Sequence, residues 1–127
     1  MKLEPGEEPV ASWVALIPFK RFEGAKEGGT LILTDRRLLM TSLTVPMVIG
    51  DLITISKAFV MWSAPLAEIR SVEPFDGKRS AQIQIETADG ESRRFMIQHR
   101  RKATIMSKEN VPVRDEAVKQ IRAAARI

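Results

Sequence analysis

Short apolar runs separated by polar turns dominate the chain, and the clearest pair of runs lies at residues 28–40. This stretch reads Gly-Gly-Thr-Leu-Ile-Leu-Thr-Asp-Arg-Arg-Leu-Leu-Met. Each run is too short for a stable helix, and side chains two positions apart share one face, as they do in a strand. Asp35 can hydrogen-bond its own backbone and favours a tight turn between the runs. The pattern predicts a β-hairpin in the middle of a small sheet.

A strict alternation of apolar and polar side chains marks residues 80–87 as a strand with one buried face. The Asp89-Gly90 pair that follows is a strong signal for a tight hairpin. Residues 92–98 return from this turn as the next strand. We expect Phe95 and Ile97 to point inward, and Arg94, Met96 and Gln98 to point outward. One core face and one solvated face are typical of an antiparallel sheet.

Three further apolar segments read as strands, at residues 10–19, 57–63 and 69–75. Pro18 suits a strand that stops or bends, and Pro65 marks a corner. A helix is predicted from Val113 or Arg114 to residue 127. Its apolar stripe consists of Ala117, Val118, Ile121, Ala124 and Ala125. Its charges complement the helix dipole, with Asp115 and Glu116 in the first turn and Arg122 and Arg126 in the last. The sequence therefore predicts a mainly β protein of seven antiparallel strands covered by one C-terminal helix.

A chain of 127 residues fits one domain and can bury a core without help from a metal or a disulfide. It has no cysteine, which excludes disulfides, thiolate catalysis and cysteine-rich zinc sites. Residues 1–9 are acidic and rich in proline, and we expect them to form an N-terminal arm. They lack the apolar core of a signal peptide, so we expect a cytoplasmic protein.

Residues 43–56 form a strongly apolar stretch between predicted strands, and we expect an apolar loop or insertion there. A membrane span needs about 20 largely uninterrupted apolar residues, whereas this stretch contains Pro46, Gly50 and Asp51. A loop of this kind either packs onto its own domain or faces a partner. The candidate interaction residues are Val45, Met47, Val48, Ile49, Leu52 and Ile53.

The sequence offers no arrangement of residues suited to catalysis, and we expect neither an enzyme nor a cofactor or metal. His99 is the only histidine, and a lone histidine at a strand end is more often structural or solvated than catalytic. The phosphate-cradling glycine motif and the His-Glu-x-x-His metal motif are both missing from the sequence. The carboxylates fall mostly at turns and outward strand positions, where solubility explains them.

Basic residues outnumber acidic ones and give a formal net charge of +4, which permits binding to anionic lipid or nucleic acid. The first candidate group is Lys20, Arg21 and Lys26 in the predicted loop 20–27, where Glu23 and Glu27 partly cancel it. The second group is Arg100, Arg101 and Lys102. Each group reads either as an anion site or as a solvated charged surface. Nucleic acid is the weaker candidate, because the few aromatic side chains are needed for the core.

Three stretches carry a resemblance to a known family. Residues 31–40 read Leu-Ile-Leu-Thr-Asp-Arg-Arg-Leu-Leu-Met, Pro5-Gly6-Glu7-Glu8 precedes the first strand, and residues 65–72 read Pro-Leu-Ala-Glu-Ile-Arg-Ser-Val. Together with the Ala88-Asp89-Gly90 turn, the strand at 92–98 and the closing helix, they resemble the GRAM-domain branch of the pleckstrin-homology superfold and its bacterial relatives. Residues 43–55 and 100–112 look longer here than is usual in that family.

The resemblance implies a seven-stranded antiparallel barrel capped by the C-terminal helix at residues 113–127. In pleckstrin-homology-like domains the loop after the first strand commonly holds phosphorylated headgroups. The resemblance therefore points to Lys20, Arg21 and Lys26 as the residues for such a ligand.

Two functions follow for a single non-catalytic binding module. In the first, the module engages a protein partner or a second copy of itself through the apolar residues 43–56. In the alternative, its basic loops bind an anionic lipid or phosphoinositide headgroup, and the protein lies peripherally at a membrane surface.

Overall fold

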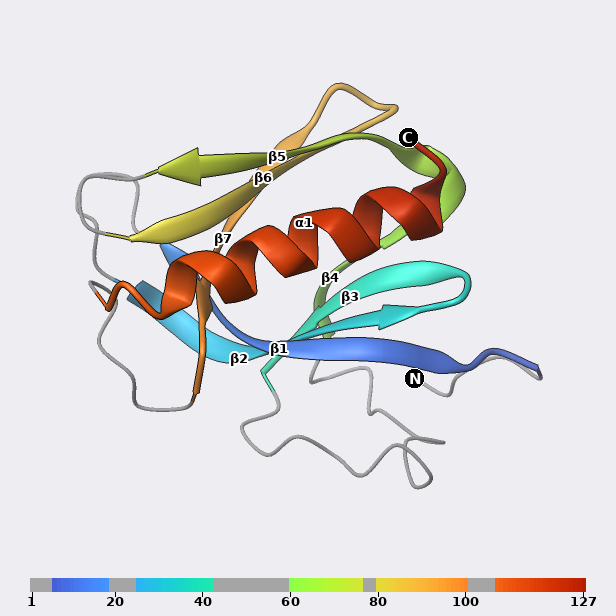
Figure 1. Ribbon diagram of the computed structural model, residues 1–127. Coiled ribbons are helices and arrows are strands. Elements are labelled where there is room, and N and C mark those ends of the chain that lie inside the picture. The colour runs from blue at the N-terminus through green and yellow to red at the C-terminus, as the bar shows by residue number, and fades with distance from the viewer. Residues whose placement is uncertain (1–5, 19–24, 43–59, 77–79, 101–106) are drawn as a thin grey trace.

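The computed structural model describes residues 6–18, 25–42, 60–76, 80–100 and 107–127. Within these residues, seven strands form one antiparallel sheet, and a single α-helix packs against it (Figure 1). The strands are β1 (Pro9–Pro18), β2 (Ala25–Thr34), β3 (Arg37–Thr41), β4 (Val60–Pro65), β5 (Ile69–Asp76), β6 (Ala81–Thr87) and β7 (Ser92–Gln98). The helix α1 spans Asn110–Ala125, and a short 3₁₀ turn, η3, spans Leu66–Glu68. The predicted mainly β class with one C-terminal helix is confirmed.

The sheet is open, so the predicted closure into a barrel is wrong. Its strand order is β4-β3-β2-β1-β7-β6-β5, which leaves β4 and β5 as the two edges. These strands follow one another in the chain, but η3 lies between them and turns the chain at the corner predicted from Pro65. The backbone N–H of Leu66 donates to the carbonyl of Arg36 at 2.9 Å, which holds this corner against the β2–β3 turn.

The edge strand β5 is poorly suited to pair with a further strand. Pro74 lies within it and has no N–H to donate. The Nε of Arg122 on α1 donates to the carbonyl of Val72 at 2.7 Å. Proline and bound side chains of this kind blunt a sheet edge.

The strand β1 joins the two halves of the sheet. It pairs with β2 along its whole length, from Pro9 to Pro18. It pairs with β7 only where Val14–Leu16 meet Met96–Gln98. Residues 9–13 of β1 therefore extend beyond the last residue pair that β1 forms with β7.

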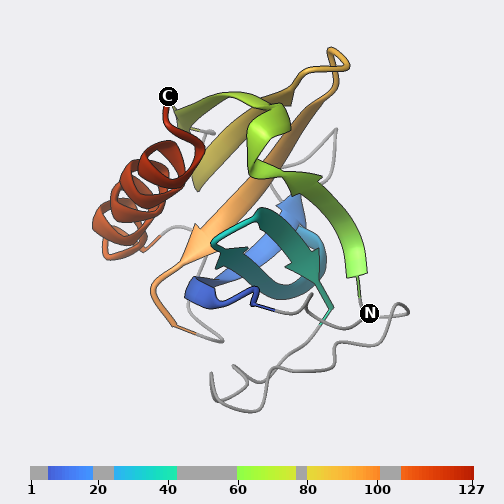
Figure 2. The same cartoon turned by 90° about the vertical axis from the view of Figure 1, so that its right-hand side faces the viewer.

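The core lies between the sheet and α1. Its largest fully buried side chains include Leu31, Leu38 and Phe95, and Trp62 stacks on Phe95 with ring centroids 5.4 Å apart. The helix contributes Ala117, Val118 and Ile121, which are the central residues of the predicted stripe. Figure 2 shows α1 beside β5, β6 and β7, away from the β3–β4 hairpin. Helix docking as predicted from the stripe is confirmed.

The helix begins earlier than expected, at Asn110 instead of residue 113 or 114. The prediction treated Pro112 as a boundary, but proline is tolerated in the first turn, where its missing N–H has no intrahelical partner. Asp115 and Glu116 therefore lie beyond the first turn, which holds no acidic residue. Arg122 lies in the last turn, as predicted.

The outer face of the sheet is less exposed than the alternation pattern predicted. Met96 and Gln98 keep only 1% and 6% of their surface, although both were expected to face solvent. Ile32 and Leu39, which pair across β2 and β3, are also buried. Alternation correctly separates the two faces of a strand, but it does not say whether the second face is covered.

The β6–β7 turn forms at Asp89-Gly90 as predicted, with Gly90 at a φ of +84°. The hydroxyl of Thr87 donates to the Asp89 carboxylate, and the backbone N–H of Glu91 donates to it at 3.0 Å. These bonds lower the pKa of Asp89 from its ordinary value because they favour the charged form, and the bond from the Thr87 hydroxyl has the largest effect.

We expect Thr87→Val to raise the pKa of Asp89 toward its ordinary value, because the largest cause of the shift is removed. A lowered folded-state pKa contributes stability above the unfolded value, and this contribution is lost as pH falls through the folded value. The variant should therefore lose less stability than the wild type below pH 4 or so. Side-chain carboxyl NMR titration of Asp89 measures the shift, and Thr87→Ser keeps the hydroxyl as a control. An unchanged titration in Thr87→Val would contradict the assignment.

Candidate binding surfaces

The basic residues expected to bind anions are only partly described by the structure. Arg100 is exposed directly after β7. Lys26 lies within β2 and not in a loop as predicted, because β2 begins at Ala25. The other four candidates, Lys20, Arg21, Arg101 and Lys102, lie outside the described residues. A shared anion site formed by these residues stays a prediction.

The apolar candidates Val45, Met47, Val48, Ile49, Leu52 and Ile53 also lie outside the described residues. The structure nevertheless fixes where their segment begins and ends, because Thr41 on β3 pairs with Val60 on β4. Hairpin connections between paired antiparallel strands usually need about 2–5 residues. The 18 residues from 42 to 59 are therefore many more than this hairpin needs. The apolar insertion at residues 43–56 lies within them.

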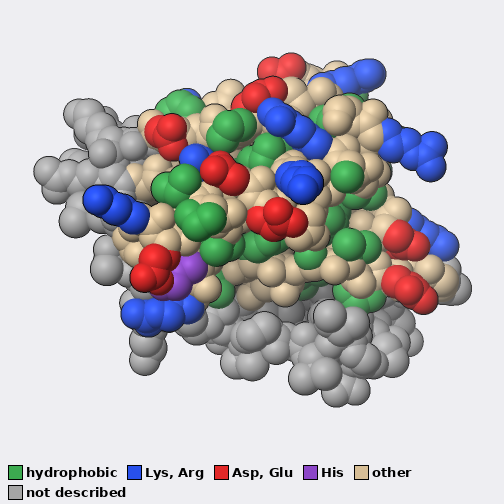
Figure 3. All heavy atoms as spheres, in the orientation of Figure 1, with side chains coloured by type: hydrophobic (Ala, Val, Ile, Leu, Met, Phe, Trp, Pro, Cys, Tyr) green, Lys and Arg blue, Asp and Glu red, His purple; other side chains and the backbone are tan. Residues whose placement is uncertain are grey.

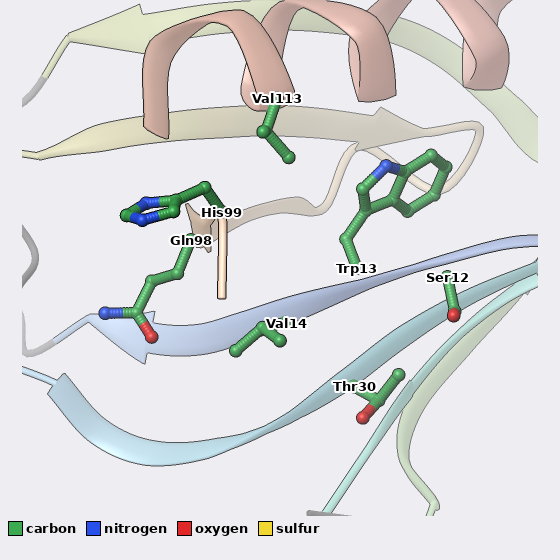
Figure 4. A pocket seen from close by; sticks show the side chains of 7 residues that line it. All are labelled: Ser12, Trp13, Val14, Thr30, Gln98, His99 and Val113. Carbon is green, nitrogen blue, oxygen red and sulfur yellow. The ribbon is translucent and has the colours of Figure 1, made fainter. Parts of the chain in front are cut away.

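A hollow of about 220 Å³ lies where β7 separates from β1 (Figure 4). Its walls include Trp13 and Ser12 from β1, Thr30 from β2, Gln98 and His99 at the end of β7, and Val113 from α1. In Figure 4 the Trp13 side chain points toward α1 and Val113 points back toward β1, whereas Ser12 and Thr30 lie on the other side of β1. The hollow therefore reaches both faces of the sheet beside the edge of β1.

His99 and the start of α1 explain why β7 leaves β1 at this point. Asn110 is fully buried, and its Oδ1 accepts the backbone N–H of His99 at 2.9 Å. The same oxygen lies 2.8 Å from the His99 Nδ1, so this ring nitrogen is the donor. The His99 Nε2 lies 3.0 Å from the Glu109 carboxylate. These contacts bind the residue that follows β7 to the start of α1.

Arg114 is another buried polar residue whose role is to hold the helix. Its guanidinium lies 3.1 Å from the carboxylate of Asp76 and 2.7 Å from that of Asp115. It also donates to the carbonyls of Phe75 and Gln82 at 3.2 and 3.1 Å. Arginine presents several donors in a fixed fork, which suits this task of joining α1 to β5 and β6.

Glu7 and Arg37 form a second buried structural pair. The Glu7 side chain is fully buried, and its two carboxylate oxygens accept the Arg37 Nε and Nη2 at 2.9 and 3.0 Å. The hydroxyl of Thr34 donates to the same carboxylate at 2.6 Å. Next to this pair, the N–H of Glu8 donates to the Asp35 side chain at 3.0 Å. Two of the stretches that carried the family resemblance, residues 5–8 and 31–40, therefore meet in space.

The part of the chain that the structure describes contains no group of three or more histidine or acidic side chains able to hold a metal ion. Among the same residues, no helix is both long and apolar enough to cross a membrane. The ionic contacts of Glu7, Arg114 and His99 join elements of the fold. The hollow beside β1 is a recess lined by residues of β1, β2 and α1 and by the end of β7.

No protein-family model and no curated protein matches this chain. The features that bear on function are the pairing of the strands, the apolar sequence between β3 and β4, and the hollow beside β1.

Proposed function

We propose that this protein is a non-catalytic interaction module with a pleckstrin-homology-like, GRAM-like fold, and that it associates through the apolar insertion at residues 43–56. A second copy of the chain is the partner that we propose to test first. The supporting observation is the pairing of Thr41 with Val60. This register makes the insertion unnecessary for joining β3 to β4.

The composition of the insertion supports a role in association. Between residues 43 and 59 the only charged side chains are Asp51 and Lys57, and most of the others are apolar. A connection that serves only to link two strands is normally short and polar. Large apolar surface in a connection is typical of segments that bury it against another molecule or another part of the domain.

Two observations support the GRAM-like assignment. The order of elements, seven antiparallel strands followed by one helix against β5–β7, agrees with what the resemblance implies. The contact between Glu7 and Arg37 gives the two resembling stretches a joint structural role. The open sheet is a departure from the barrel that the resemblance implies.

The experiment compares two doubly substituted variants in light scattering over a wide range of protein concentration. Val48→Asp with Ile49→Asp places two charges on the proposed apolar surface. Thr44→Asp with Thr54→Asp adds the same charge to the same segment at polar positions. We expect the wild type and the threonine variant to associate with rising concentration, and the Val48/Ile49 variant to stay monomeric. Desolvation of two carboxylates in an apolar interface is the reason.

A wild type that stays monomeric at the highest concentration would count against the second copy as partner. Association that survives the Val48/Ile49 substitutions would exclude the insertion from the interface. Sedimentation with vesicles containing anionic phospholipid tests the alternative function. Binding that rises with anionic lipid content and disappears in Lys20→Ala with Arg21→Ala would replace our proposal by the membrane function.

A further inference from the structure

Along residues 9–13, one edge of β1 has no neighbouring strand among the residues that the structure describes. β7 pairs with β1 only as far as Val14, whereas β1 continues to Pro9 in its pairing with β2. Among the described strands, none pairs with residues 9–13 on the β7 side. Val10 and Ser12 in this stretch are exposed. Unpaired backbone N–H and C=O groups along such an edge are a template for another strand.

The hollow lies at the position that a continuation of β7 would occupy. Its walls include Gln98 and His99 at the end of β7, and Ser12 and Trp13 on the unpaired part of β1. Because Trp13 and Val113 lie on one side of β1 and Ser12 and Thr30 on the other, the space crosses the plane of the sheet (Figure 4). The hollow therefore lies in the plane of the sheet, beside the part of β1 that pairs with no described strand on this side.

His99, the first residue after β7, binds to the start of α1 and not to β1. The backbone N–H of His99, which would be the next residue in the ladder, donates to the Asn110 side chain and not to β1. The ring of His99 is held by Asn110 and Glu109 on the helix side. His99 is thereby held against the residues at the start of α1.

The size of the hollow indicates what kind of group it receives. Pockets for small-molecule ligands usually measure about 300–1,000 Å³, and this hollow of about 220 Å³ is smaller. It suits one or two side chains better than a cofactor or a drug-sized ligand. Figure 3 shows uncharged and hydrophobic surface along the side of α1 that faces β1, with charged side chains gathered on the outer side of the helix.

From these observations we infer that β1 and the hollow together accept an extended peptide segment of another protein as an additional strand. The peptide backbone pairs with residues 9–13 of β1, in line with β7. One of its apolar side chains enters between Trp13 and Val113, and the side chains before and after it lie on the Ser12 side of β1. The preferred peptide therefore alternates apolar and polar residues. None of the residues that line the hollow belongs to residues 43–56, so the inference does not rest on the proposed function.

Selection from a random library of displayed linear peptides against the full chain tests the inference. We expect enriched peptides with alternating apolar positions. Val113→Arg places a long charged side chain in the hollow and should weaken these peptides at least tenfold. Val111→Arg is the matched control, because Val111 is exposed on the same helix and does not line the hollow. Circular dichroism and thermal unfolding establish that both variants fold.

A second measurement works without any change to the protein. A synthetic copy of an enriched peptide should slow amide hydrogen exchange within residues 9–13. N-methylation of every second peptide bond should abolish binding when the methylated N–H groups face β1. Methylation of the other set, which faces away from β1, should leave binding intact. Failure to enrich any peptide, equal binding to Val113→Arg and Val111→Arg, or protection confined to other residues would each overturn the inference. Peptide binding that persists in the Val48/Ile49 variant separates this site from the insertion.

Discussion

Replacing Glu7 by glutamine is expected to lower the free energy of unfolding by about 3 kcal/mol, because the substitution removes the buried negative charge that binds the Arg37 guanidinium and the Thr34 hydroxyl. The Glu7 side chain is fully buried, whereas that of Arg37 keeps 16% of its surface. Breaking a buried pair by removing one partner typically costs about 3–5 kcal/mol. The partial exposure of Arg37 places the expected value at the lower end. Urea unfolding followed by tryptophan fluorescence measures the change.

The neighbouring Glu8 supplies the control for this prediction. Glu8 is exposed, and it contacts Asp35 through its own backbone N–H and carbonyl. Glu8→Gln removes the same charge from the same segment and should change stability by less than about 0.5 kcal/mol. If Glu7→Gln costs no more than Glu8→Gln, the pair with Arg37 does not hold the lead-in of β1 to the β2–β3 turn.

Replacing Gly29 by alanine disrupts the packing of β2 against the end of β3. A Cβ atom at residue 29 would lie 1.8 Å from the carbonyl oxygen of Thr41 and 2.8 Å from its carbonyl carbon. Both are backbone atoms, so the strand itself must move, and the pairing of Thr30 with Thr41 must change. Overpacking in a well-packed region typically costs about 1–3 kcal/mol and occasionally more. We expect about 3 kcal/mol or more, because no side chain can rotate to relieve the clash.

Gly28→Ala is the matched control, one residue earlier in the same strand. Its added Cβ would lie 2.7 Å from the Cδ2 of Leu16, which is the end of a flexible side chain. Rotation of that leucine relieves the contact, and the lower flexibility of the unfolded chain returns about 0.4–1 kcal/mol. Thermal unfolding of both variants decides the prediction. If Gly29→Ala is no less stable than Gly28→Ala, the contact between residue 29 and the Thr41 backbone tolerates an added Cβ atom.

Local patterns predicted the hairpins well. The turn at Asp35, the strand at 92–98 and the Asp89-Gly90 turn appear where the sequence placed them, because each depends on residues close together in the chain. Openness of the sheet depends on how η3 directs β5 relative to β4, and no local pattern carries that information. The start of α1 was missed for a different reason, since Pro112 is allowed within a first turn as well as before one.

The candidate site was harder to predict than the fold. The hollow exists because β7 stops pairing with β1 at Val14, and this follows from the contact between His99 and Asn110. Those two residues are separated by a long charged connection, so their contact leaves no periodic signal. His99 stands out in the sequence as the only histidine, but no sequence pattern places it beside a recess. Glu7 and Arg37 are 30 positions apart in the chain, and only the structure shows that they form an ion pair.

The dual pairing of β1 also determines the order in which the protein is expected to fold. Each hairpin joins segments that are near in the chain, so its closure costs little entropy and is fast. The β1–β7 ladder joins the first strand to the last and contains only three residue pairs. It should form after the hairpins and limit the folding rate, and amide protons of Val14–Leu16 should then lose protection together with global unfolding.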